Sequence, residues 1–206
     1  MGYNHYWRRP LEIKRDAFSL IVADFRRCVL ALDDAGVVLA GPTGEGLPRI
    51  DQDVIAFNGV RHCGHPENEA ICIPFPSERA SGVGDSSDAI VGSWSIGVQI
   101  RRRTCNGDCS YESFILERIL TPEETKPSGA RDGGRHLDDC KTGFRPYDLA
   151  VQCALLVSKH HLGDEFYVYS SGSDWHWNDV RRMCYVHLGY PLSEFRIDRD
   201  AGLVEP

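Results

Sequence analysis

One apolar stretch constrains the fold more than any other part of this chain. Leu149 to Val157 is apolar on nearly every side of a helix, and Pro146 suits the first turn of a helix that continues to about His161. A helix without a polar face has to be covered all round by other elements. We therefore expect this helix at the centre of one hydrophobic core.

Apolar spacing predicts the other elements. Helices are expected over about Lys14 to Leu32, where apolar residues recur every three or four positions, and over Trp175 to Leu188, which Gly189 ends. Short alternating or apolar runs predict strands. These runs are Tyr3–Arg8, Val37–Ala40, Val54–Phe57, Ile71–Phe75, Ser95–Ile100, Ser113–Leu120, Glu165–Tyr169 and Glu194–Asp198.

These elements predict one α+β domain spanning residues 1–206, with a mostly antiparallel sheet packed by about three helices. Two segments, near 76–92 and 121–136, are rich in Gly, Pro, Ser and charge, and we expect them to be exposed loops. Asn106-Gly107 is a strong turn signal. It predicts a β-hairpin between Ser95–Ile100 and Ser113–Leu120.

Charge and hydropathy exclude several classes of protein. A net charge of −7 disfavours a nonspecific nucleic-acid binder. The only triple of basic residues, Arg101 to Arg103, is interpreted as a solvated strand edge, with phosphate binding as the alternative. No run approaches the about 18 to 20 apolar residues of a membrane span, and the opening residues lack a secretory signal. We expect a cytoplasmic protein with no membrane association.

The eight cysteines are spread from Cys28 to Cys184, and we expect most of them to be reduced. Cys28 and Cys153 fall inside apolar helical patterns, where a thiol behaves as a small buried apolar group. Zinc is the one cofactor that the sequence suggests, since two imidazoles and two thiols would complete a tetrahedron. A disulfide between Cys105 and Cys109, or a polar loop beside reduced thiols, are the alternatives. The candidate ligands are His62, His65, Cys105 and Cys109.

A second candidate site precedes the central helix. Cys140 is the best candidate nucleophile, because the positive end of a helix and nearby cationic side chains lower the pKa of a thiol. Its base would be His65 or His5. Glu69 and Asp148 are a candidate acid/base pair, although Asp148 in a first helical turn equally suits the helix dipole.

The same helix start could bind a phosphate or carboxylate through its free amides and polar side chains, although no P-loop is present. Aromatic and polar residues near these loops could form the walls of a pocket. The candidate binding residues are His5, Tyr6, Asn58, Lys141, Thr142, Arg145, Tyr147 and Asp174.

Three short elements carry a resemblance to other proteins. They are the opening Gly2 to Trp7, the Phe57-Asn58-Gly59 turn, and Cys140-Lys141-Thr142 followed by Pro146-Tyr147-Asp148. In these elements the chain resembles a family of small proteins encoded by tailed phages and prophages. The resemblance implies a compact accessory protein of a phage-like or horizontally acquired locus, and it supplies no reaction.

The leading functional expectation is a small accessory enzyme, a hydrolase or transferase. Its pocket would be lined by the N-terminal aromatic strand, the His62 to Glu69 loop and the helix start at Cys140 to Asp148. One alternative is a binding protein that sequesters a small anionic ligand or a host protein. The other is a structural protein stabilised by zinc.

Overall fold

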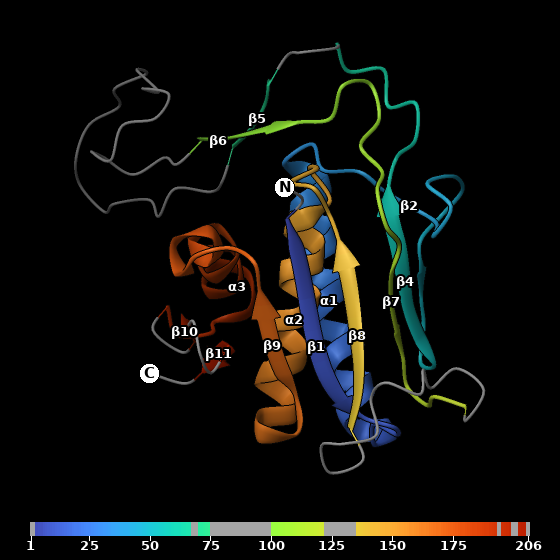
Figure 1. Ribbon diagram of the computed structural model, residues 1–206, viewed down its shortest axis with the longest axis vertical. Helices are drawn as coiled ribbons and strands as arrows, with labels where there is room; N and C mark the ends of the chain where they lie inside the picture. The colour runs from blue at the N-terminus through green and yellow to red at the C-terminus, as the bar shows by residue number, and fades with distance from the viewer. Residues whose placement is uncertain are drawn as a thin grey trace.

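The computed structural model describes residues 3–66, 70–74, 100–121, 135–192, 195–198 and 202–204 (Figure 1). Its helices are α1 (Arg15–Asp34), α2 (Asp148–Leu162) and α3 (Asn178–Leu188), with short 3-10 helices η2 (Gly163–Glu165) and η3 (Asp174–Trp177). Its strands are β1 (Asn4–Pro10), β2 (Leu39–Ala40), β3 (Arg49–Ile50), β4 (Val54–Gly59), β5 (Ala70–Pro74), β6 (Ile100–Thr104), β7 (Phe114–Glu117), β8 (Arg135–Lys141), β9 (Tyr167–Ser170), β10 (Arg196–Asp198) and β11 (Gly202–Val204).

The mixed α+β architecture with antiparallel sheets is confirmed. Strand β1 lies between β8 and β9, and α1 and α2 lie behind this sheet (Figure 1). Every residue of α2 from Asp148 to Lys159 is buried, which agrees with the central position that its apolar sequence predicts. In the described part of the chain, none of the helices combines the length and hydropathy that crossing a bilayer requires.

The second sheet is built on β4, whose six residues are all buried. Strands β2, β3 and β7 all pair with it in antiparallel register. The Phe57 ring lies between those of Phe114 and Phe25, with centroids 5.1 Å and 5.3 Å away, so it packs β4 against both β7 and α1. This sheet supplies the support for the segments that follow β4 and precede β7.

The predicted hairpin around Asn106-Gly107 is wrong. Strand β6 pairs with β5, from Ala70 opposite Thr104 to Pro74 opposite Ile100, whereas β7 pairs with β4. The Asn-Gly turn forms, but the pairing partners of a strand are chosen by long-range packing that a local turn signal does not contain. We call the pair β5 and β6 the β5–β6 ribbon; Figure 1 shows it beyond the N-terminal end of β1.

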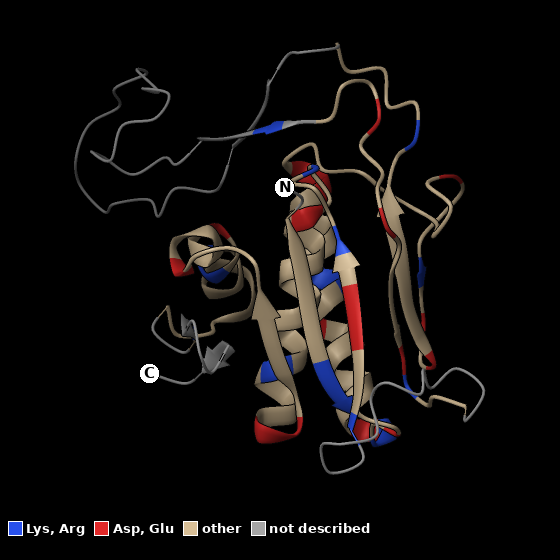
Figure 2. Cartoon of the chain, viewed as in Figure 1, with Lys and Arg blue, Asp and Glu red and all other residues tan. Residues whose placement is uncertain are grey.

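Strand β8 was missed by the sequence interpretation, which put a loop near 121–136 and a helix start after it. It pairs with β1 along its whole length, from Lys141 opposite Asn4 to Arg135 opposite Pro10. Adjacent acidic residues in its middle hide the apolar alternation of a strand, and Figure 2 shows them next to basic residues of β1. The loop predicted near 76–92, and residues 122–134 of the other loop, lie outside the described residues.

Candidate metal centre

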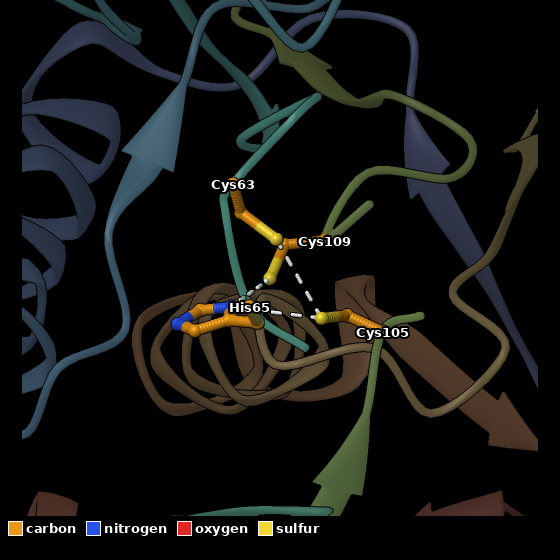
Figure 3. A group of neighbouring side chains, drawn as sticks. All are labelled: Cys63, His65, Cys105 and Cys109. Carbon is orange, nitrogen blue, oxygen red and sulfur yellow. Dashed lines mark hydrogen bonds between the residues drawn. The ribbon is translucent and has the colours of Figure 1, made fainter. Parts of the chain in front are cut away.

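Three thiols and one imidazole meet at the base of the β5–β6 ribbon (Figure 3). Cys63 and His65 come shortly before β5, and Cys105 and Cys109 follow β6. Their four ligand atoms all lie within 4.8 Å of one another. The Cys105 sulfur is 3.6 Å from the Cys63 sulfur and 3.5 Å from His65 Nδ1, and the Cys109 sulfur is 3.4 Å from the same nitrogen.

Local backbone geometry brings these side chains together. Gly64 has φ +77°, a left-handed conformation that lets the chain turn between Cys63 and His65. Asn106 and Gly107 also have positive φ, and the Asp108 N–H donates to the Cys105 carbonyl at 3.0 Å, as in a type I′ turn. The Cys63 N–H donates to the Gly107 carbonyl at 3.2 Å, which joins the two ligand-bearing segments.

The end of β4 fixes the position of Cys109. A side chain at Gly59 would place its Cβ 1.9 Å from the Cys109 carbonyl oxygen, so only glycine allows this close approach. The buried Asn58 amide donates to the Tyr111 carbonyl at 3.0 Å and accepts from the Tyr111 N–H, also at 3.0 Å. Asn58, a candidate binding residue, therefore uses its side chain to hold the segment that carries Cys109.

The electrostatic environment separates the thiols. Burial works to raise the pKa of Cys63, but hydrogen bonds from the His65 backbone and from the neighbouring thiols outweigh it, and the net pKa is lowered. Burial raises the pKa of Cys109. The Arg145 guanidinium donates to the carbonyls of Cys105 and Asp108, the latter at 2.7 Å. A thiolate at Cys63 and a nearby cation suit a centre that gains negative charge when its thiols ionise.

The predicted ligand set needs one correction. His65, Cys105 and Cys109 belong to the group, but Cys63 takes the place assigned to His62. His62 is exposed and has φ +56°. The signal that could have identified Cys63 is the glycine that follows it, because a left-handed residue at Gly64 lets the side chains before and after it face one ligand.

Cys140 lies in a setting that opposes nucleophilic chemistry. Its side chain is fully buried on the core face of β8, and burial raises its pKa instead of lowering it as expected from the helix start. The Cys140 thiol and the Tyr147 hydroxyl both donate to the Glu112 carbonyl, at 3.5 Å and 2.7 Å. Its proposed base His65 contacts Cys105 and Cys109 instead, and Glu69 lies outside the described residues.

Asp148, the first residue of α2, is the centre of a buried polar network. Its carboxylate accepts hydrogen bonds from His5 Nε2 at 2.9 Å, from Arg103 Nη1 at 2.8 Å and from the Thr142 hydroxyl. Burial works to raise its pKa, but Arg103, His5 and Thr142 lower it further than burial raises it. The sequence predicted His5, Thr142 and Asp148 as site residues, and the structure brings these three together.

Arg103 was missed by the sequence interpretation, which placed residues 101–103 on a solvated edge. Its side chain is 2% exposed, and it joins the β5–β6 ribbon to the start of α2 through Asp148. The Arg103 guanidinium also lies over the Phe144 ring, 4.9 Å from its centroid. The side chains of residues 101 and 102 are outside the described part.

The remaining candidate binding residues are scattered. Tyr6 is exposed on the outer face of the β8-β1-β9 sheet. The Lys141 ammonium lies 5.4 Å from the centroid of the Tyr111 ring, and Asp174 forms an ion pair with Arg181. These three residues do not converge with the network around Asp148 in any contact that the structure records.

No known protein family matches the chain, and no curated protein or solved structure matches it either. The resemblance to small phage proteins therefore stays a prediction. Inference about function has to come from the sites themselves.

Proposed function

We propose that the chain is a zinc-binding protein in which Cys63, His65, Cys105 and Cys109 hold a structural zinc ion. The spacing of the ligand atoms carries this proposal. A tetrahedral zinc with Zn–S bonds of about 2.3 Å and a Zn–N bond of about 2.0 Å separates two sulfurs by about 3.8 Å and a sulfur from a nitrogen by about 3.5 Å. The distances between these atoms, 3.6 Å, 3.5 Å and 3.4 Å, fit those edges.

The composition of the ligand set favours a structural role. Four protein ligands leave no position for a water molecule, whereas catalytic zinc usually keeps one. Three thiolates and one imidazole around a divalent ion carry a charge of −1, which the guanidinium of Arg145 would offset. The setting of Cys140 supports a structural function over the thiol enzyme that the sequence suggested.

The zinc would act as a clamp on the β5–β6 ribbon. It would join the segment before β5 to the segment after β6, next to the point where Arg145 holds the Cys105 and Asp108 carbonyls. Arg103, two residues before Cys105, then reaches Asp148 in the core. A cytoplasmic location suits this proposal, because the described cysteines are all reduced.

Metal analysis of matched variants tests the proposal. Protein purified without chelator should contain one zinc ion per chain, and so should His62→Ala, because His62 is outside the ligand group. Cys63→Ser should contain almost none, because the loss of a thiolate ligand weakens a site by more than the about 10- to 100-fold that the loss of a supporting hydrogen bond costs. Equal zinc in Cys63→Ser and wild type, measured by elemental mass spectrometry, would contradict the proposal.

A second candidate function, binding of a small anion, is favoured by a specific observation at Arg103. Its Nη1 is bonded to Asp148, but Nε and Nη2 are buried without a hydrogen-bond partner, as is His5 Nδ1. The Nε–Nη2 edge of a guanidinium is one that binds carboxylate or phosphate with two parallel hydrogen bonds. A ligand of this kind would satisfy donors that are otherwise costly to bury.

Calorimetric titration with inorganic phosphate and with acetate tests this second candidate. Wild type should bind one of them saturably, and Arg103→Lys should lose that binding, because lysine keeps a charge near Asp148 but has no two-pronged edge. Asp174, which lies in an ion pair with Arg181, supplies a control in Asp174→Asn, which should bind as wild type does. Absence of saturable binding to wild type would remove this candidate.

A further inference from the structure

A second sulfur cluster lies in the helical core. Cys28 of α1, Cys153 of α2 and Cys184 of α3 have their sulfur atoms within 4.8 Å of one another, and all three side chains are fully buried. The Met183 sulfur is 3.6 Å from that of Cys153. We name Cys28, Cys153 and Cys184 the thiol triad, and we propose that it binds a trivalent metalloid, such as arsenite or antimonite, through three sulfur bonds.

The geometry of the thiol triad suits one three-coordinate centre. Each thiol comes from a different helix, so the three sulfurs surround a common point instead of lying in a row. Hydrogen bonds from Cys153 and Cys184 lower the pKa of Cys28, while the same contacts raise that of Cys153. The three sulfurs therefore already interact as a unit, with Cys28 the one that ionises first.

Charge decides which centre the thiol triad accepts. Three thiolates around a trivalent ion are neutral, whereas the same thiolates around a divalent ion carry −1 and around copper(I) −2. An uncompensated charge is very costly in a fully buried site. The charges nearest to Cys28 are those of Asp24 and His187, and Asp24 opposes its ionisation. A neutral complex fits this core, while the charged zinc complex fits the more exposed first centre beside Arg145.

The binding step is balanced without an oxidant or a reductant. Arsenite is As(OH)3 at neutral pH, and each of its three hydroxide groups leaves as water with the proton of one thiol. Three As–O and three S–H bonds break, and three As–S and three O–H bonds form. Arsenic stays trivalent, and the product As(SR)3 is neutral.

Access to the thiol triad requires a local opening. All three side chains are shielded from solvent, so α3 has to separate transiently from α1 and α2 before the ligand can enter. We therefore expect binding to be slow and to accelerate in mild denaturant, which populates the open state.

Arsenite titration of the zinc-loaded full chain tests the proposal. After incubation and gel filtration, wild type should retain one arsenic per chain with its zinc content unchanged, and X-ray absorption should show three sulfur neighbours at arsenic. Cys184→Ala should retain arsenite at least about tenfold more weakly, since the loss of a ligand costs more than the loss of a supporting bond. Cys28→Ala is the second variant if Cys184→Ala does not fold, which circular dichroism will show.

Two results would overturn the proposal. One is an arsenic content of Cys184→Ala or Cys28→Ala equal to that of wild type. The other is arsenic uptake by wild type in step with zinc loss, which would place the metalloid at Cys63, Cys105 and Cys109. A chain that contains no zinc but still loses arsenite with Cys184→Ala would contradict only the zinc proposal, so the two proposals fail separately.

Discussion

Replacing Asp148 by asparagine is expected to lower the free energy of unfolding by about 3–5 kcal/mol, the usual effect of removing one partner from a buried ion pair. Asp148 is fully buried and accepts hydrogen bonds from β1, β6 and the segment before α2. Asparagine keeps the shape but leaves the buried Arg103 guanidinium without a counter-charge. Urea unfolding followed by circular dichroism measures the change.

Asp139→Asn is the matched control for Asp148→Asn. Asp139 is also a carboxylate at the same end of the sheet, but it lies exposed on β8. Its replacement should change the unfolding free energy by less than about 0.5 kcal/mol, as is usual for surface positions. If both variants lose the same stability, the network around Asp148 does not hold the fold as described.

The stabilisation from Asp148 should depend on pH in one direction. The pKa of Asp148 is lower in the folded protein than in the unfolded chain, where a carboxyl titrates near about 3.9, so unfolding takes up a proton as the solution becomes acidic. Its contribution is therefore complete above the unfolded pKa and is lost as pH falls through the folded pKa. The stability difference between wild type and Asp148→Asn should shrink over that acid range.

The sequence could predict those features that follow from local composition. The central position of α2 follows from an apolar surface on all sides, and the ends of α1 and α3 from their spacing and from Gly189. Three of the four atoms of the metal centre, those of His65, Cys105 and Cys109, were found because thiols and imidazoles near turns are rare and chemically distinct.

The features that were not predicted depend on long-range pairing. Cys140 reads as the start of a helix in the sequence, but pairing of β8 with β1 turns its thiol into the core. Arg103 reads as a surface charge until β6 is placed against the start of α2. In both cases the sequence determines the chemistry of the side chain, while the partner strand determines whether it is solvated.

Zinc removal should produce the other large effect. A ligand that binds only the folded state stabilises it by about 4.1 kcal/mol when its free concentration is 1,000 times the dissociation constant. If Cys63, His65, Cys105 and Cys109 hold zinc, a strong chelator should therefore lower the unfolding free energy by several kcal/mol, and added zinc should restore it. Cys63→Ser should show no response to chelator, whereas His62→Ala should respond as wild type does.

The position of Arg103 predicts that the zinc and the Asp148 network stabilise each other. Arg103 stands two residues before the ligand Cys105, so a zinc ion that fixes Cys105 also restricts Arg103 near Asp148. In Asp148→Asn this restriction has no ion pair to support. The zinc-dependent gain in unfolding free energy should then be smaller than in wild type by about 0.5–3 kcal/mol, the range of coupling between sites that share a structural element.

A thermodynamic cycle measures this coupling from four unfolding free energies, those of wild type and Asp148→Asn, each with zinc and with chelator. Asp139→Asn repeats the cycle as the control and should keep the full response to zinc, because its carboxylate does not contact the β5–β6 ribbon in the described structure. An equal zinc response in Asp148→Asn and wild type would mean that the metal orders only its own loops. A reduced response would mean that the zinc acts through Arg103 on the body of the protein, and that metal loss releases the β5–β6 ribbon from the start of α2.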